Sequence, residues 1–384
     1  MTNALNLSAI LDDVGPQFAA RTLEFDQTAT FVADNIAVLK SRNLLSALVP
    51  ETYGGAGLRH SEMCSFLRAL AHHCPATALT LSMHQHIVAT AAANDRAGRP
   101  GRALLEKVAG AQLLLVTTGG GDWPDSNGAA RRAAGGYLVS AIKPFASGSP
   151  IGDVLVTSAA CVDAADEGQV IHFSVPLQSK GIRFRDDWDT FGMRATGSQT
   201  VELTDVFIPD GAVTLRRPRA GFPAIYGVVL TVAMPLIMSV YVGIAEAAAA
   251  IARERALTRA SDSITASLIG EMETLLTVAS LAHNDMVRLN NELDFEPSVD
   301  LANLILMRKS ICSTHAVKTV EKAMEAAGGG GYFRKTGLEK LLRDAYAGLY
   351  HPLQEKRQHL FSGRLALGAD PLGEPAQVLR KTAA

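Results

Sequence analysis

Histidine carries the acid–base chemistry that this sequence could perform near neutral pH. His84 and His86 lie two residues apart in a helical stretch, and His351 lies in a second helical region. Imidazole has an ordinary pKa between pH 5 and 8, so it can hold or release a proton there. A structural, hydrogen-bonded histidine is the alternative for His84 and His86. Glu355, one helical turn beyond His351, is a further candidate, but its basic neighbours favour a solvated charge.

Cysteine and metal chemistry are not indicated. The four cysteines are scattered and form no C-x-x-C pair. Disulfide frameworks and zinc sites both require recognisable cysteine or histidine spacing. The sequence therefore predicts neither a disulfide framework nor a metal site.

The composition excludes two classes of protein. The chain has 384 residues, a formal net charge of −2, 48% hydrophobic residues and 19% charged residues. A near-neutral chain lacks the basic surface of a nucleic-acid-binding protein, and this apolar share is too high for a disordered one. Aromatic residues make up only 6%, so the apolar surplus consists of aliphatic residues that suit close helix packing.

One segment raises the question of a membrane span. Residues 222–245 contain no charged side chain and are numerous enough to cross a bilayer. Pro235 and Gly227 interrupt the segment, and arginines flank both of its ends, so no orientation is indicated. We therefore favour a buried core helix over a transmembrane one. Residues 1–12 lack the pattern of a signal peptide, and a cytoplasmic protein is expected.

Three zones of different periodicity must position these side chains. Residues 1–112 have the apolar spacing of helices, and long helical segments return over residues 216–384. The middle zone, residues 113–215, contains short β-rich runs without intervening helices, which favours an antiparallel barrel or sandwich. No G-x-G-x-x-G turn follows a strand, so a Rossmann unit is not supported. The predicted strands are residues 113–118, 137–142, 153–160, 170–175, 181–185 and 200–208.

This order of zones resembles the acyl-CoA dehydrogenase superfamily. Three motifs carry the resemblance: VPETYGGAG at residues 49–57, GMRATGSQTVELTDVFIP at 192–209, and AGGGGY at 327–332 with LRDA at 342–345. The resemblance implies an α+β fold with three domains. These are an N-terminal all-α domain (1–112), a middle antiparallel β-barrel or sandwich domain (113–215) and a C-terminal four-helix bundle (216–384).

The resemblance also implies a flavin, FAD with FMN as the alternative, bound between the middle and C-terminal domains of a homotetramer or homodimer. Thr117 or Thr118 matches the hydroxyl residue that the family places against the flavin edge, although threonines also suit a strand end. Phe145 and Ser147 match the aromatic and hydroxyl pair that the family places on the flavin ring. An apolar wall with a few oriented polar groups is what a flavin requires.

An arginine and a glycine turn complete the implied cofactor contacts. Arg255 matches the arginine that the family uses on the FAD pyrophosphate, and guanidinium suits phosphate because it binds two oxygens at once. The family's Phe-Gly after this arginine is Thr258-Arg259 here, and a solvated helix face is an equal alternative. Gly329 and Gly330 would let the backbone approach the cofactor, or merely end a helix.

The sequence departs from the family where the catalytic base should be. Most members carry a Glu on the last helical arm, at a position that falls on Pro352, beside His351. Others carry it on the long apolar helix, where this chain has Ala233, followed by Met234 in place of an active-site arginine. Both positions therefore lack the carboxylate with which a dehydrogenase removes the α-proton.

Members that work as flavin monooxygenases use histidines instead, to protect the oxygenated flavin and to donate a proton. His351 beside the vacated base position is one candidate for this role. His84 and His86 lie on a helix that walls the substrate pocket in this fold, and Met234 belongs to the same pocket. These assignments follow from the resemblance.

Three functions are consistent with these features. The first is an FAD-dependent dehydrogenase that oxidises the CH–CH group of an acyl-CoA or another acyl-like small molecule. The second is a flavin-dependent monooxygenase that uses reduced flavin and oxygen, with histidines in place of the Glu. The redox partner would be an electron-transfer flavoprotein or a flavin reductase. The third is a non-catalytic scaffold, and we rank the three in this order.

Overall fold

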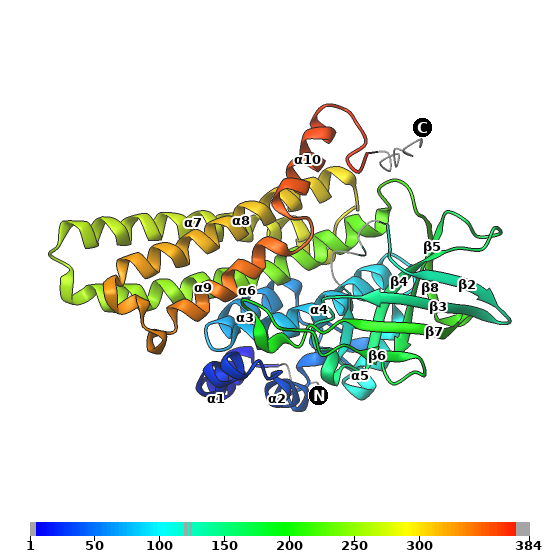
Figure 1. The fold of residues 1–384 in the computed structure, drawn as a ribbon, viewed down its shortest axis with the longest axis horizontal. Coiled ribbons are helices and arrows are strands. Elements are labelled where there is room, and N and C mark those ends of the chain that lie inside the picture. The colour runs from blue at the N-terminus through cyan, green and yellow to red at the C-terminus, as the bar shows by residue number, and fades with distance from the viewer. Residues whose placement is uncertain (1–4, 119–121, 123–124, 374–384) are drawn as a thin grey trace, which may run out of the picture.

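The computed structural model describes residues 5–118, 122 and 125–373 and has helices on either side of a sheet in chain order (Figure 1). The N-terminal helices are α1 (Leu7–Thr28), α2 (Ala33–Ser41), α3 (His60–Ala71), α4 (Pro75–Arg96) and α5 (Arg102–Ala111). The C-terminal helices are α6 (Ala224–Ala256), α7 (Ser263–Asn290), α8 (Val299–Ala326), α9 (Leu338–Tyr346) and α10 (Glu355–Ala366). The fold class expected from the sequence is confirmed.

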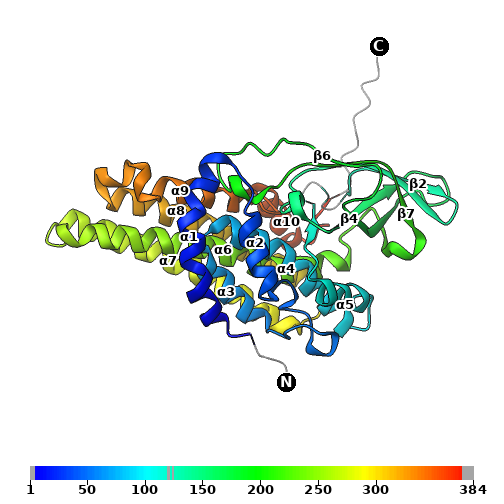
Figure 2. The ribbon, with the colours of Figure 1, turned by 90° about the horizontal axis from the view of Figure 1, so that it is seen from below.

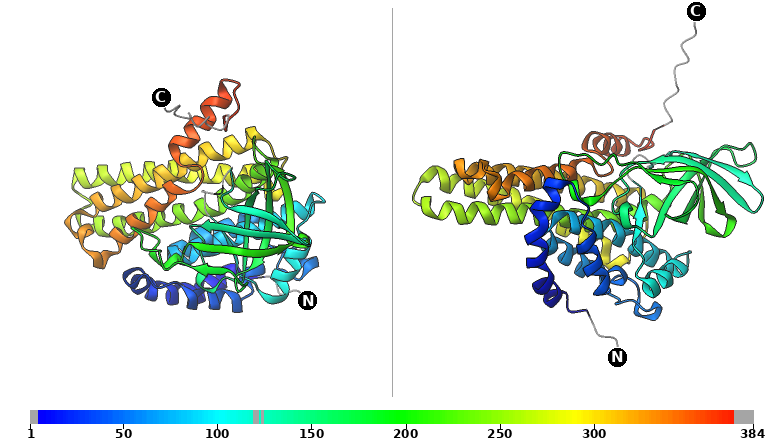
Figure 3. Two further views of the ribbon diagram at one scale, coloured as in Figure 1. Left: turned by 45° about the vertical axis from the view of Figure 1, so that its right-hand side comes forward. Right: turned by 60° about the horizontal axis from the view of Figure 1, so that its bottom comes forward.

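The strands form one curved sheet at one end of the long helices (Figures 2 and 3). They are β1 (Leu115–Thr117), β2 (Ala129–Ala133), β3 (Gly136–Lys143), β4 (Val154–Cys161), β5 (Gln169–Pro176), β6 (Ile182–Phe184), β7 (Val201–Pro209) and β8 (Val213–Pro218). Their order is β6-β7-β3-β2-β4-β5-β8, and β1 pairs with β4.

One detail of the predicted sheet needs correction, because the sheet is mixed and not purely antiparallel. β4 runs parallel to both β1 and β2, while the other pairings among the described strands are antiparallel. The sequence shows where strands occur but not whether the intervening connection reverses the chain. It also missed β2 and β8, whose arginine-rich sequences AARRA and VTLRRP lack a clear apolar alternation.

The long helix α6 is the centre of the helical part, and the expectation of a buried helix there is confirmed. Its most apolar window has a mean hydropathy of 2.2 and is 94% buried, packed against α3, α4, α7 and α8. α7 is also long and apolar enough to cross a membrane, but its window is only 17% buried. Burial inside the protein therefore explains the composition of α6, whereas α7 presents apolar side chains at the surface.

A proline inside α6 is accommodated by side chains from two neighbouring helices. Pro235 has no N–H to donate to the carbonyl of Thr231, four residues earlier. Asn290 of α7 donates its Nδ2–H to that carbonyl at 3.2 Å. His60 of α3 donates its Nε2–H to the adjacent carbonyl of Val232 at 2.9 Å. The break in the helical hydrogen bonds is thus satisfied from α3 and α7.

Candidate functional site

The first group of candidate residues lies where β1 and β3 end. Thr118 donates its hydroxyl hydrogen to the Asp122 carboxylate and lies 3.0 Å from the hydroxyl of Thr157. The ammonium of Lys143, fully buried at the end of β3, lies 2.6 Å from the other Asp122 oxygen. Burial lowers the pKa of Lys143, and Asp122 opposes this effect. The ion pair therefore couples the two strand ends, and Thr117 and Thr118 lie half-buried beside it.

Phe145 and Ser147 follow β3 in a turn that presents an aromatic ring. Phe145 has a left-handed φ of 61° and a 54% exposed side chain. Trp188 meets it edge to face, with the ring centroids 6.0 Å apart. The hydroxyl of Ser147 lies 2.8 Å from that of Ser198. This arrangement of exposed ring and neighbouring hydroxyls suits a flat, partly polar cofactor such as a flavin.

The second group lies inside the helical part and comes from four elements. His86 is on α4, Tyr241 on α6 and Lys309 on α8, while His351 follows α9. The hydroxyl oxygen of Tyr241 lies 2.6 Å from Nε2 of His351. Lys309 donates to the carbonyl of Leu353 at 3.1 Å. The structure thus joins His351 to Tyr241, and both Lys309 and the predicted His86 lie close enough to influence the pKa of His351.

Both histidines of this group are uncharged at neutral pH. Burial lowers the pKa of His351 to about 3, and the nearby Lys309 and His86 contribute to this shift. Burial also lowers the pKa of His86 to about 4 and that of Lys309 to about 8. His86 is 7% exposed, and its Nδ1 has no hydrogen-bond partner within the described part of the chain. Such a buried, unpaired nitrogen is a place where a ligand atom would be stabilised.

His84 is built into the fold. Its Nε2–H donates to the carbonyl of Leu45 at 2.7 Å, and its Nδ1 accepts the N–H of Leu115 at 3.0 Å. Both ring nitrogens are therefore used in joining α4 to the start of β1, and the geometry favours the structural alternative for His84. Met234 lies on α6 and is 3% exposed. Its place in a substrate pocket stays a prediction.

The third group lies at the far end of α6. A Cβ on Gly330 would come within 1.9 Å of Nη2 of Arg255, so glycine is required for the guanidinium to lie there. The exposed Arg255 makes no salt bridge with the residues that the structure describes, while Arg259 donates to the carbonyl of Ala326 at 2.7 Å. A Cβ on Gly329 would meet open space. An unpaired guanidinium on an open glycine turn suits a phosphate.

Glu355 does not have the environment of a catalytic base. Its carboxylate lies 3.1 Å from the ammonium of Lys356, which lowers the pKa of Glu355. A carboxylate that removes a carbon-bound proton needs a raised pKa, usually from burial. The solvated-charge interpretation of Glu355 is therefore favoured.

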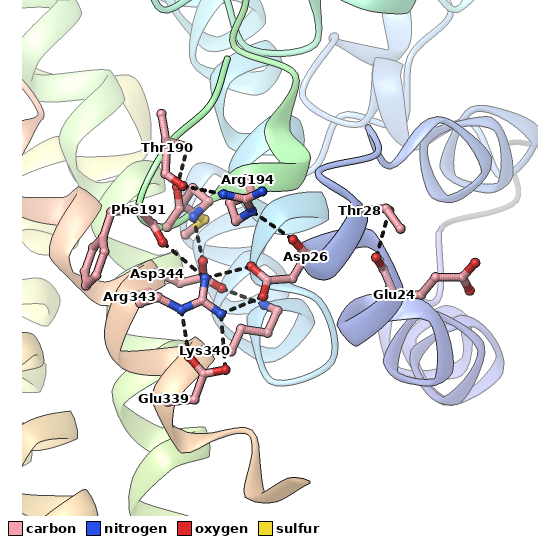
Figure 4. Close-up of polar contacts among 12 residues, drawn as sticks. Glu24, Asp26, Thr28, Thr190, Phe191, Arg194, Glu339, Lys340, Arg343 and Asp344 are labelled. Atoms are coloured by element: carbon pink, nitrogen blue, oxygen red, sulfur yellow. Dashed lines mark hydrogen bonds and ion pairs between the residues drawn. The ribbon is translucent and has the colours of Figure 1, made fainter. Parts of the chain in front are cut away.

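A network of ion pairs holds the arm that begins with α9 (Figure 4). Arg343 donates to both carboxylate oxygens of Asp26 on α1, at 3.0 and 2.6 Å. Asp344 accepts the backbone N–H of Met193 and the ammonium of Lys340, both at 2.6 Å. The arm is therefore tied to α1 and to the loop that precedes β7.

Comparison with known proteins identifies the family. The N-terminal domain model of acyl-CoA dehydrogenases matches residues 13–101, and the C-terminal domain model matches residues 236–355, together more than half of the chain. The chain belongs to the acyl-CoA dehydrogenase superfamily. This agrees with the resemblance seen in the sequence motifs and with the observed fold.

Relatives within the superfamily have different activities. A putative acyl-CoA dehydrogenase, YdbM of Bacillus subtilis, is 24% identical over 88% of this chain and 91% of its own length. A dibenzothiophene monooxygenase of Mycolicibacterium goodii is 23% identical over 84% of each chain. The structure of KijD3 in complex with FMN and dTDP-3-amino-2,3,6-trideoxy-4-keto-3-methyl-D-glucose is 26% identical, with a TM-score of 0.84 over 96% of this chain and 97% of that one.

Three side chains that adjoin the predicted site residues were not among the residues predicted from the sequence. Trp188 faces Phe145, while Tyr241 and Lys309 adjoin His351. A tyrosine within the charge-free segment of α6 was a usable signal, as was a lysine in the apolar repeat of α8. Within the described ranges, no three His, Cys, Asp or Glu side chains are grouped so as to hold a metal ion.

Proposed function

We propose that this protein is a flavin-dependent monooxygenase that uses reduced flavin and dioxygen, and not a dehydrogenase of acyl thioesters. The observation that carries the proposal is the group formed by His86, Tyr241 and His351 where the family's carboxylate base would act. Pro352 occupies the base position itself. Imidazole is often a general base, but burial lowers the pKa of His351 to about 3, which makes it a weak base for removing an α-proton.

The charges around His351 support the same proposal. The charges that shift its pKa come from Lys309 and His86, and both act to lower it. The closest downstream acid, Glu355, is paired with Lys356. The surroundings of His351 therefore do not provide a negatively charged base.

A flavin fits the residues that are present, and when bound it would supply the electrons for oxygen activation. Phe145 and Ser147 would contact its ring, Thr117 and Thr118 its edge, and Arg255 a phosphate. Both FMN and FAD carry a phosphate that Arg255 could bind. The FMN complex of KijD3 and the dibenzothiophene monooxygenase support a flavin monooxygenase. In this reaction a flavin reductase would supply the reduced flavin.

The flavin would lie between two copies of the chain. Thr118 bonds to Asp122, and Asp125 lies 4.0 Å from Arg219, five residues before α6. Thr118 is therefore near the start of α6. Arg255 lies 31 residues after Ala224, the first residue of α6, which is about 46 Å at the rise of an α-helix. This is longer than a flavin nucleotide, so Arg255 of a second copy would complete the site in a homo-oligomer.

The test compares the two reactions in one protein. Protein loaded with flavin is mixed anaerobically with acyl-CoAs of several chain lengths, and we expect no bleaching of the flavin spectrum. The reduced, loaded protein is then mixed with oxygen, and we expect a transient absorbance that outlasts that of free flavin. His351→Ala should shorten this transient, whereas the exposed His359→Ala should not. Bleaching by any acyl-CoA would instead establish a dehydrogenase.

A further inference from the structure

The contact between Tyr241 and His351 joins two segments that are 110 residues apart in the chain. The two rings lie with centroids 5.4 Å apart and planes inclined by 60°. Tyr241 is completely buried, and the backbone of Gly348 packs on its ring, where a Cβ would come within 3.1 Å of the ring carbons. The tyrosine is therefore held in place on α6 by the same connection that carries His351.

The available hydrogen-bond partners favour one direction for this hydrogen bond. A tyrosine hydroxyl has one hydrogen, and His351 Nε2 is the acceptor in reach of Tyr241 among the described residues. Burial raises the pKa of Tyr241 well above its usual value, with a contribution from Asp344, so the hydroxyl keeps its hydrogen. A buried donor without an acceptor is costly, which favours donation from Tyr241 to Nε2. A neutral imidazole whose Nε2 accepts carries its own hydrogen on Nδ1.

The surroundings keep this imidazole neutral. Lys309 is 1% exposed, and its ammonium donates to the carbonyl of Leu353, two residues after His351. His86, on α4, also lies close enough to lower the pKa of His351. A positive charge on His351 would be repelled by that of Lys309. His351 is thus arranged as an uncharged group.

We propose that Tyr241 is a positioning residue that fixes His351 in the neutral form with its hydrogen on Nδ1. His351 then offers the site an N–H donor and does not act as a base. The ligand atom that faces it is a hydrogen-bond-accepting oxygen. That this ligand atom takes part in the reaction with dioxygen rests on the proposed function. The tautomer of His351 does not depend on it.

The tautomer is measured on the flavin-free protein. Full-length protein labelled with ¹⁵N-histidine gives one pair of ring signals for each of its 10 histidines, and His351→Gln identifies the pair to be followed. We expect a protonated Nδ1 and an unprotonated Nε2 in the wild type. A protonated Nε2 would overturn the proposal. The assignment requires His351→Gln to fold, and unchanged signals of the other nine histidines would show that it does.

The role of Tyr241 is measured by removing its hydroxyl. Tyr241→Phe keeps the ring and should shift His351 towards the form with hydrogen on Nε2. Gly348→Ala, which crowds the tyrosine ring, should act in the same direction. The matched control is Tyr137→Phe, which removes a buried hydroxyl bonded to Asp166 in the sheet, and should leave the His351 signals unchanged. Unchanged His351 signals in Tyr241→Phe would contradict the positioning role.

A second experiment tests donation from Nδ1. In His351→Asn the side-chain amide nitrogen would lie near the place of Nδ1, so this variant should retain the transient seen when oxygen meets the reduced flavin. His351→Ala should shorten it roughly a hundredfold to a thousandfold, as expected for loss of one fixed donor. Equal shortening in both variants would argue against donation. Absence of any transient in the wild type would instead reject the proposed function and leave the tautomer result standing.

Discussion

At the residue scale, hydrogen bonding distinguishes structural histidines from candidate site histidines, which burial alone does not. His84 and His86 are both buried and only two positions apart. His84 uses both ring nitrogens within the fold, whereas His86 leaves its Nδ1 without a partner among the described residues. His351 uses Nε2 for Tyr241. Among the three predicted histidines, the pairing of both ring nitrogens therefore sets His84 apart from His86 and His351, which stay the ligand-facing candidates.

The proposed phosphate contact of Arg255 can be tested with three flavins. Arg255→Ala should weaken binding of FMN and FAD about tenfold to a hundredfold, because a hydrogen bond to a charged group contributes roughly 1.5–3 kcal/mol. Riboflavin, which has no phosphate, should bind equally to both proteins in a fluorescence titration. Arg253→Ala is the matched control, since Arg253 is an exposed arginine paired with Glu273. An equal loss for riboflavin would exclude the phosphate contact.

At the element scale, the shape of α6 depends on side chains outside it. Pro235 removes one helical hydrogen bond, and Asn290 supplies the missing donor to the Thr231 carbonyl. The element that carries Tyr241 is therefore held in register by α7. The arm that carries His351 is held separately, by the ion pair of Arg343 with Asp26 and by the hydrogen bond from the Met193 N–H to Asp344.

A double-mutant cycle tests the repair of the α6 proline. Asn290→Ala should lower the free energy of unfolding by about 1–3 kcal/mol, because it leaves a buried carbonyl without a donor. In the background of Pro235→Ala, residue 235 regains an N–H four residues after Thr231, and the same substitution should cost less. Urea unfolding of the four proteins gives the coupling, with the exposed Asn284→Ala as control. Additive effects would mean that the two residues do not share this carbonyl.

The ion pair of the arm can be tested in a similar way. Asp344→Ala leaves the ammonium of Lys340, 5% exposed, without its partner. We expect a loss of about 3–5 kcal/mol, the usual cost of breaking a buried pair. Replacing both residues, as Lys340→Met with Asp344→Leu, should cost less than Asp344→Ala alone. Urea unfolding measures stability, and faster limited proteolysis near residues 347–354 should accompany the single substitution.

At the scale of the whole molecule, several histidines are buried in the interior in their uncharged form. Burial lowers the pKa of His60, His84, His86 and His283 to about 4 each. The unfolded chain has an ordinary histidine pKa near 6.5, so it binds more protons between pH 4 and 6.5. Stability is therefore complete above pH 6.5 and falls as the pH drops through this window.

Acid should consequently unfold the protein well before its carboxylates are protonated. At pH 5 each of the four histidines costs about 2 kcal/mol by linkage, a total of about 8 kcal/mol, comparable with the whole stability of a typical domain. Urea unfolding at pH 7.5, 6 and 5 should show this loss. The exposed His359→Gln should not alter the pH dependence. A stability that is constant from pH 7.5 to 5 would contradict the burial of these imidazoles in neutral form.

The sequence by itself determined the order of helical and strand-rich zones and the buried character of α6, and it predicts that the family's carboxylate is replaced by Pro352. Helical and strand periodicity are local properties of the sequence. A long segment without charges indicates burial, whichever elements it packs against. Tertiary structure alone decided that β4 runs parallel to β1, that Tyr241 contacts His351, and that both ring nitrogens of His84 form structural hydrogen bonds. These features depend on which distant surfaces meet and exclude water, because hydrogen-bond partners and pKa shifts arise only there.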